Sequence, residues 1–456
     1  MIPYADEPVA EVSSNKVWRR LAVWMEWCFA AAIVLAIFAL IRDVLVDGYL
    51  PDPFLNSKSE TFTDWYNPAY WAYNRGTYSE WSSIYPPFAF VFLRLFSNSE
   101  CYRYSIDAAR GCDPAGIVIE TVLTFVNFGL AWRVFHKVDR TTALPRAIAV
   151  GLGFPAIYAW ERGNLIVPCF TAYILAYGNL LKSARLKTLC VVISIHFKPY
   201  LILALAGRIL KREWIWLEWC ALWFVMVYAV SYVIFGAGDP ITIFNNTLGF
   251  EHTPGVDLIG FTTTYTALLT ILKLPLPLTE ILGSSPIEMI ESTIPILIYA
   301  GVASSLPCLA YAMFRPNICT RGQVSAFVLI IFMAISTSAG GYALHFALFF
   351  IMFESWRGPS RILVLVSTYL WCIPFDFPVV DILQEYGYSF LGQRNVQYEL
   401  ALTFGELVRP GLLLLIEYGL VWVFAANIFR DISGAVLSSK ENQASISAGS
   451  TSRRVQ

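Results

Sequence analysis

The stretch TFTDWYNPAYWAYNRGTYSEWSSIYPPF, residues 61–88, follows the first apolar segment of the chain directly. It carries the carboxylate Asp64, the guanidinium Arg75, a series of tyrosine and tryptophan rings, and the triplet Tyr85-Pro86-Pro87. The stretch is too polar to cross a bilayer, and Trp and Tyr rings concentrate at the membrane–water boundary. We therefore expect an interfacial platform that presents Asp64 at the mouth of a cavity in the membrane.

The composition is that of an integral membrane protein. Hydrophobic residues make up 57% of the chain and charged residues only 14%, whereas soluble domains carry roughly 25% charged residues. Many windows approach the roughly 20 apolar residues that span a bilayer. The net charge of −1 gives no indication of a nucleic-acid partner, and 4 histidines with scattered cysteines lack the spacing of metal ligands. We expect neither a nucleic-acid partner nor a metal site.

Basic residues orient the chain in the membrane. Lys16, Arg19 and Arg20 precede the apolar run Leu21–Ile41, so residues 1–20 should stay in the cytoplasm. The run is longer than the core of a signal peptide, which favours a retained first helix. Residues 43–113 then form the first external loop, in which Pro86–Phe96 predicts a surface or re-entrant helix. Further helices are expected at 115–136, 143–160, 165–181, 214–236, 287–314, 322–338, 343–354, 361–375 and 410–429.

The segment Lys187–Arg212 is expected to be a re-entrant hairpin. Basic residues cluster at both of its ends, and Lys198-Pro199 lies at its midpoint. Both ends should face the cytoplasm, so the chain must rise and return in two arms of about eleven residues, which cannot each span the membrane. The sequence thus predicts an all-α polytopic domain over 21–430 with about twelve segments. External loops are expected at 237–286, with an amphipathic surface helix at 258–272, and at 376–408. Residues 431–456 should be a disordered cytoplasmic tail.

Polar groups from distant parts of the chain converge on the outer side in this topology. Ionisable groups at membrane depth usually line a cavity or bind something. Cations suggest an anionic partner such as a phosphate, and an external aspartate suggests a general base. The members of this expected cluster are Asp64, Arg75, Arg162, Asn164, Lys198 and His345.

Each member also has a purely structural interpretation. Asp64 could cap the helix that follows it, and Arg75 could extend among tyrosines toward lipid headgroups. Arg162 could pair with its neighbour Glu161, and His345 could be a core histidine. Lys198 leaves the least room for such a role because it lies in the middle of an apolar run.

Two further motifs stay open at this point. Cys101 and Cys112 share the first external loop and could form a disulfide on an oxidising side, or remain two buried thiols. Asn245-Asn246-Thr247 fits the glycosylation sequon, which matters only in a eukaryotic secretory pathway.

The order of these motifs resembles glycosyltransferase family 87, the polyprenol-phosphate-mannose-dependent mannosyltransferases of the GT-C superfamily. It rests on Asp64–Tyr66, the YPP triplet, Gly163-Asn164 and Lys198-Pro199, over roughly residues 61–214. The Gly-Gly-Tyr-x-x-His of Gly340–His345 is similar to the family's late Ser/His element. The layout is also similar to the dolichyl-phosphate-glucose-dependent glucosyltransferases of N-glycan assembly.

The resemblance implies a GT-C-type bundle and an inverting transfer of a sugar, mannose first, from a polyprenyl-phosphate donor to a hydroxyl of a lipid-linked or glycan acceptor. Asp64 would be the base. The active site would face outside, with the plasma (inner) membrane as the expected location. No cofactor is expected, and the first loop lacks a DxD, although a divalent cation stays open. Donor phosphate would be bound by Lys198, Arg162, Arg75 and His345, and substrate by Tyr85, Asn164, Trp65 and Tyr66.

The sequence departs from the family at one point and leaves two other functions open. Glu161–Asn164 lacks the Gln or second Asn that usually follows the glycine, which puts the sugar contact in doubt. A flippase or transporter of lipid-linked saccharides would need inverted repeats and a through path of charges. An O-antigen polymerase or ligase would carry its catalytic groups in a late external loop, for which 376–408 is the candidate.

Overall fold

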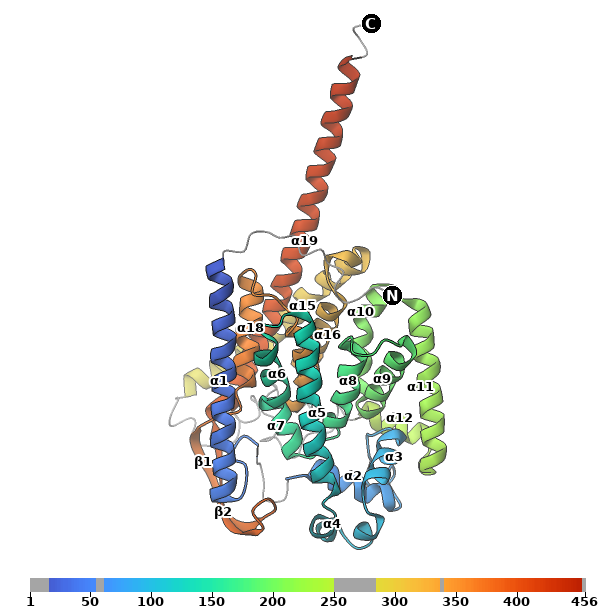
Figure 1. Cartoon of the computed structure of the whole chain (residues 1–456), viewed down its shortest axis with the longest axis vertical. Helices are drawn as coiled ribbons and strands as arrows, with labels where there is room; N and C mark the ends of the chain where they lie inside the picture. Colours follow the sequence, from blue (N-terminus) through green and yellow to red (C-terminus); the bar gives the residue numbers. More distant parts are fainter. Residues whose placement is uncertain (1–15, 55–60, 250–283, 337–339, 453–456) are drawn as a thin grey trace.

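The computed structural model describes residues 16–54, 61–249, 284–336 and 340–452. In this part of the chain, helices form a bundle that carries one small two-stranded sheet (Figure 1). Six helical stretches are long and apolar enough to cross a membrane, so the expectation of a mostly helical membrane protein is confirmed. The count of about twelve spans stays a prediction. The six are α1 (Lys16–Asp47), α5 (Ala115–Val138), α6 (Ala143–Leu152) with α7 (Phe154–Glu161), α11 (Trp214–Phe235), α15 (Ser284–Phe314) and α19 (Phe404–Ser452).

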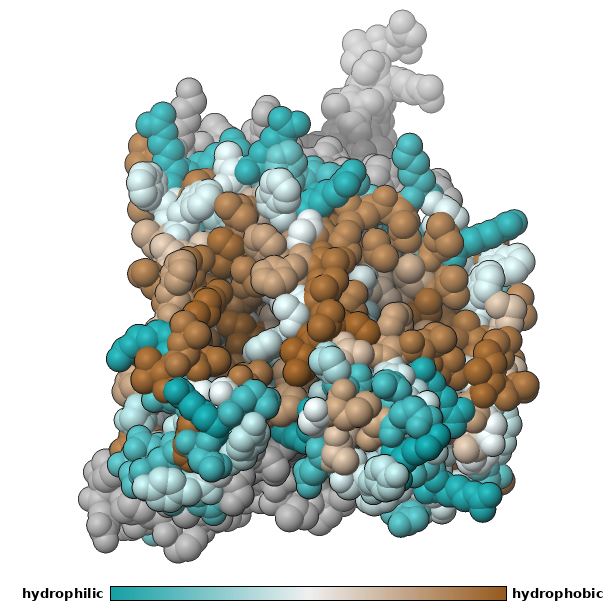
Figure 2. All heavy atoms as spheres, turned by 60° about the horizontal axis from the view of Figure 1, so that its bottom comes forward, coloured by the Kyte–Doolittle hydropathy of each residue, from teal (hydrophilic) through white to brown (hydrophobic). Residues whose placement is uncertain are grey.

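The outer surface of the bundle is apolar in the middle. Leu35 is 68% exposed, Phe125 64% and Val233 77%, and all three lie on long helices. Figure 2 shows a broad band of apolar side chains between two hydrophilic ends. Soluble proteins rarely expose so large a contiguous apolar surface. The band therefore fits contact with lipid chains.

The interior of the bundle is completed by shorter helices. The helix α9 ends at Phe197, and the next helical turn begins at Pro199. The chain reverses between them, because the start of α9 and the helix α10 line the same pocket. The shorter elements are α8 (Ile166–Tyr177), α9 (Ala184–Phe197), η2 (Pro199–Leu205), α10 (Ala206–Leu210), η5 (Pro316–Ile318), α16 (Arg321–Ile335), η6 (Gly341–Leu344), α17 (His345–Ile351) and α18 (Pro359–Cys372).

The segment 61–113, which the sequence predicts in the first external loop, folds into a set of short helices at one end of the bundle, the lower end in Figure 1. They are α2 (Thr63–Tyr73), α3 (Pro87–Phe96), η1 (Ser99–Tyr102) and α4 (Ile106–Cys112), with α12 (Pro240–Gly249) beside them. The helix α3 begins at the proline pair as expected. A disulfide joins Cys101 to Cys112, with 5.6 Å between their Cα atoms, which decides between the two alternatives for these cysteines.

One helix that the sequence predicts as continuous is broken. The expected helix 143–160 is divided at Gly153 into α6 and α7. Pro155 sits in the first turn of α7, and since its nitrogen carries no hydrogen it cannot continue the hydrogen-bond ladder of α6. A side chain at Gly153 would lie 2.9 Å from the carbonyl oxygen of Cys372, so the break also lets α18 approach closely.

The all-α expectation holds only as a mostly helical fold, because strands form in the segment 376–408, where the sequence predicts a polar external loop. This segment forms an antiparallel hairpin of β1 (Pro378–Ser389) and β2 (Arg394–Thr403). Val380 and Leu402 pack on Ile287 of α15, and the ring of Tyr398 packs on Tyr49, with 4.6 Å between centroids. Long apolar windows dominate the search for membrane helices, and the weaker period-two alternation of these strands escapes it.

The C-terminal helix is longer than the sequence predicts. The helix expected at 410–429 is α19, which begins at Phe404 and continues to Ser452, projecting away from the bundle (Figure 1). The structure thus gives a helical backbone to most of the segment 431–456, where the sequence predicts a disordered tail. The amphipathic helix expected at 258–272 lies outside the described residues.

A buried ion pair ties α1 to α6 and α18. Arg146 donates to both carboxylate oxygens of Glu26, at 3.0 and 2.8 Å, and Tyr369 donates to the same carboxylate at 2.6 Å. The indole of Trp356 also donates to Glu26. Glu26 is fully buried and Arg146 nearly so. Every charge in this network therefore has hydrogen-bond partners, which burial in an apolar interior requires.

Replacing Glu26 by alanine should lower the free energy of unfolding by about 3–5 kcal/mol, because it leaves the Arg146 guanidinium buried without its counterion. The measurement is the thermal unfolding midpoint in detergent. Glu218→Ala, an exposed glutamate of α11, is the control and should leave the midpoint nearly unchanged. A double Glu26→Met/Arg146→Met variant should recover much of the loss, and a double variant less stable than Glu26→Ala would contradict the explanation.

The stability of the hairpin should depend on pH through Asp52. Burial, with a smaller contribution from Asp376, raises the pKa of Asp52 to about 7, although the Ala401 amide donates to its carboxylate at 2.6 Å. The folded state thus holds the proton more tightly than the unfolded chain does. The stability gained from this bound proton is complete below the ordinary pKa of an aspartate in the unfolded chain. It is lost as the pH rises to the folded-state pKa of about 7.

Stability should therefore fall between about pH 4 and pH 7, by up to about 4 kcal/mol for a shift of about three pKa units, and should level off above pH 7. Hydrogen exchange of the β2 amides measures it. Asp52→Asn should flatten this dependence, and an equal slope in both proteins would show that another group titrates.

Candidate active site at the junction of α2 and α7

Two turns far apart in the sequence are joined by their backbones. The amide of Phe62 donates to the carbonyl of Glu161 at 2.7 Å, and the amide of Asp64 donates to that of Arg162 at 2.9 Å. Phe62 has a φ of 60° and Gly163 a φ of 61°. A side chain at Gly163 would meet the Phe62 ring at 2.7 Å. Only glycine fits this position, since it tolerates the left-handed conformation and leaves room for Phe62.

This junction aims the Asp64 carboxylate at the residues after α7. Asn164 Nδ2 donates to Asp64 Oδ2 at 2.6 Å, and Arg162 Nη2 lies 3.3 Å from Oδ1. The Asp64 side chain is 17% exposed, so it remains within reach of a ligand. The residue that caps α2 is Phe62, with no side-chain cap, so Asp64 is not the helix cap that the sequence left open. Both carboxylate oxygens are instead oriented by polar side chains.

Lys198 reaches the same region from the tip of the α9–α10 hairpin. Its Nζ donates to the Tyr85 hydroxyl at 3.3 Å and lies 6.0 Å from the centre of the Tyr342 ring. The charge of Asp64 acts on both Lys198 and Tyr85. The carboxylate, the amine and the YPP tyrosine therefore share one site, although they come from α2, the hairpin tip and the turn before α3.

Glu120 of α5 is a member of the site that the sequence analysis missed. It is fully buried, and neither of its carboxylate oxygens has a hydrogen-bond partner among the described residues. The nearby charges that act on it are those of Asp64 and Lys198. The sequence did indicate Glu120, because an acidic residue inside an apolar membrane segment is energetically costly and usually functional.

Arg75 is separated from the carboxylate by the length of α2. It is exposed beyond the C-terminal end of that helix, whereas Asp64 lies in the first turn. His345 begins α17 and is buried, and its ring packs on Phe170 with 3.8 Å between ring centroids. Of the Gly-Gly-Tyr-x-x-His motif, Tyr342 lies beside Lys198. The expected phosphate contact of His345 stays a prediction.

Trp65 and Tyr66, two of the rings that the sequence predicts at the membrane–water boundary, are inside the protein. Both are fully buried. The Tyr66 hydroxyl donates to the carbonyl of Asp113 at 2.7 Å, and a side chain at Gly116 would lie 2.5 Å from the Trp65 indole. They fasten α2 to α5 and so hold the helix that carries Asp64. Their expected contact with substrate stays a prediction.

The site combines a proton acceptor with a fixed positive charge. A carboxylate oriented by an amide and a guanidinium can accept a proton from a hydroxyl, and a lysine beside it can stabilise negative charge that develops nearby. Within the described ranges, no cluster of three or more His, Cys, Asp or Glu side chains is placed to hold a metal ion.

Comparison of the chain with protein-family models, with curated proteins and with solved structures finds no match in any of the three. Functional assignment therefore rests on the site itself.

Gly163→Ala should destabilise the junction by about 1–3 kcal/mol, because alanine is strained at this φ and meets Phe62. The measurement is the unfolding midpoint together with hydrogen exchange at the Asp64 amide. Gly129→Ala, in the middle of α5 with open space around it, is the matched control and should be neutral or slightly stabilising. If the two substitutions had the same effect, the junction would not depend on Gly163.

Proposed function

We propose that this chain is an integral-membrane inverting glycosyltransferase that uses a polyprenyl-phosphate sugar. The observation that carries the proposal is the Asp64 carboxylate, held by Asn164 and Arg162 with Lys198 on the same side of the bundle. The resemblance to glycosyltransferase family 87 supports it, because that family needs an aspartate base beside cations that bind a lipid phosphate. Mannose is the first expectation for the sugar.

In the proposed reaction, an acceptor hydroxyl oxygen attacks the anomeric carbon of the donor. Its proton passes to a carboxylate oxygen of Asp64 while the bond between the anomeric carbon and the phosphate oxygen breaks. The bonding electrons leave with the polyprenyl phosphate, and Lys198 stabilises the developing negative charge. One displacement inverts a β-linked donor to an α product. Arg162 and Asn164 orient the Asp64 carboxylate, and Glu120 lies near Lys198.

Two observations support an active site that faces outside. The basic residues before α1 favour a cytoplasmic N-terminus, so the loop after α1 would face outside. The disulfide between Cys101 and Cys112 lies in this loop, and disulfides persist on oxidising sides of membranes. The donor would be a lipid of the outer leaflet of the plasma membrane, and the acceptor a lipid-linked or other glycan.

Glu120 favours one alternative, a transporter of lipid-linked saccharides. A buried carboxylate without hydrogen-bond partners in a spanning helix is a usual component of proton relays in transporters. The O-antigen polymerase or ligase gains no comparable support. One aspartate of its candidate loop, Asp376, is paired with Arg409 at 2.9 Å at the base of the hairpin.

Asp64→Asn should lower the rate of sugar transfer by about 10²–10⁴-fold, because the amide cannot accept the proton. Purified protein in proteoliposomes, supplied with a polyprenyl-phosphate mannose and a glycan acceptor, provides the measurement. Asp107→Asn, an exposed aspartate of the same loop, is the control and should keep the wild-type rate. Transfer by Asp64→Asn at that rate would remove Asp64 as the base.

The same proteoliposomes distinguish the transporter. If the sugar lipid crosses the bilayer without a new glycosidic bond, and Glu120→Gln stops the movement while Asp64→Asn does not, the chain is a transporter. Lys198→Gln should reduce transfer if the chain is the enzyme, and should raise the KM for the donor because the phosphate loses its cation.

A further inference from the structure

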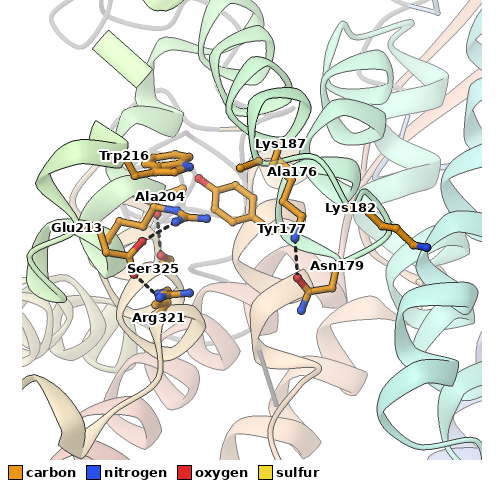
Figure 3. A pocket seen from close by; sticks show the side chains of 12 residues that line it. Ala176, Tyr177, Asn179, Lys182, Lys187, Ala204, Glu213, Trp216, Arg321 and Ser325 are labelled. Carbon is orange, nitrogen blue, oxygen red and sulfur yellow. Dashed lines mark hydrogen bonds and ion pairs between the residues drawn. The ribbon is translucent and has the colours of Figure 1, made fainter. Parts of the chain in front are cut away.

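A second polar site lies at the end of the bundle opposite Asp64. A cavity of about 220 Å³ opens where the base of the α9–α10 hairpin meets the starts of α11 and α16 (Figure 3). It is near α10, at the upper end in Figure 1, whereas α2 lies at the lower end. Basic residues gather at this end, which therefore faces the cytoplasm by the positive-inside rule. The charged residues that line the cavity are Lys182, Lys187, Arg208, Glu213 and Arg321.

The positive charges that line the cavity outnumber the negative charges. Four cations and one carboxylate line it, which leaves a formal charge of +3. The Glu213 carboxylate forms an ion pair with the Arg208 guanidinium at 2.6 Å and a second one with that of Arg321. Lys187 Nζ donates only to a neutral acceptor, the side-chain oxygen of Asn179 at 2.9 Å, while Arg208 and Arg321 repel it. A bound anion would relieve this repulsion.

The orientation of the Arg208 cation also suits an anionic ligand. The Arg208 guanidinium stacks on the Trp216 ring, 3.8 Å from its centre, which fixes the plane of its donors. A fixed guanidinium fork matches the oxygens of a phosphate, and a lysine adds a point charge. Sites for drug-sized ligands have roughly 300–1,000 Å³, so this cavity suits a group of phosphate or pyrophosphate size.

We propose that this cavity binds a phosphate group on the cytoplasmic side. The group is a phosphomonoester of an inner-leaflet lipid or a soluble phosphate, since the chemistry of recognition is the same. The ligand would join the two arms of the hairpin at their base, through Lys187 and Arg208. The tip of that hairpin carries Lys198. The proposal does not rest on sugar transfer at Asp64.

The test uses the full chain and two probes. Inorganic phosphate is titrated by calorimetry into protein in lipid-free detergent, and phosphatidic acid is offered in phosphatidylcholine nanodiscs, with native mass spectrometry to detect bound lipid. A double Lys182→Gln/Lys187→Gln variant should bind at least about tenfold more weakly. Arg185→Gln is the matched control, since Arg185 lies between the two lysines, is exposed and does not line the cavity.

Glu213→Gln should change phosphate affinity in the opposite direction. Removal of the competing carboxylate should tighten phosphate binding, and damage to the fold would not produce such a gain. Lys182→Gln alone covers the case in which the double variant fails to fold, because Lys182 is exposed. Binding of inorganic phosphate identifies a soluble ligand, and binding of phosphatidic acid alone identifies a lipid headgroup. Binding of neither probe, or equal loss in Arg185→Gln, would overturn the proposal.

Discussion

The arrangement of the site depends on the two backbone hydrogen bonds that join the turn before α2 to the turn after α7. They fix the start of α2 against the end of a buried helix, and with it the direction of the Asp64 side chain. Gly163 makes the approach possible, and Trp65 and Tyr66 hold α2 against α5. Without this junction the first external loop would carry its aspartate at no defined distance from Asn164 or Lys198.

Two buried glutamates of this bundle differ in their hydrogen bonding. The Glu26 carboxylate receives donors from Arg146, Tyr369 and Trp356, so its charge stabilises the packing of helices around it. Glu120 is equally buried, yet among the described residues it has charges nearby and no hydrogen-bond partner. A group left in that condition costs stability, and such groups persist where a ligand or a proton uses them.

The α9–α10 hairpin connects the two ends of the molecule. Its tip brings Lys198 to the Asp64 site, and its base contributes Lys187 and Arg208 to the cavity at the opposite end. Short arms of this kind are tolerated at membrane depth only when protein surrounds them, and here α8, α11 and α16 do so. One buried element thus presents cations at both ends of the bundle.

The sequence by itself determined the membrane class, the reversal at Lys198-Pro199 and the helix that begins at the proline pair, because hydropathy, charge bias and proline geometry are local properties. It also singled out Asp64, Asn164 and Lys198. Only the tertiary structure decided which residues meet: it brought Glu120 and Tyr342 to the site and left Arg75 exposed beyond the far end of α2. The hairpin of β1 and β2 and the break at Gly153 were also decided there. Both depend on contacts with residues distant in sequence, Ile287 and Cys372, which no local pattern specifies.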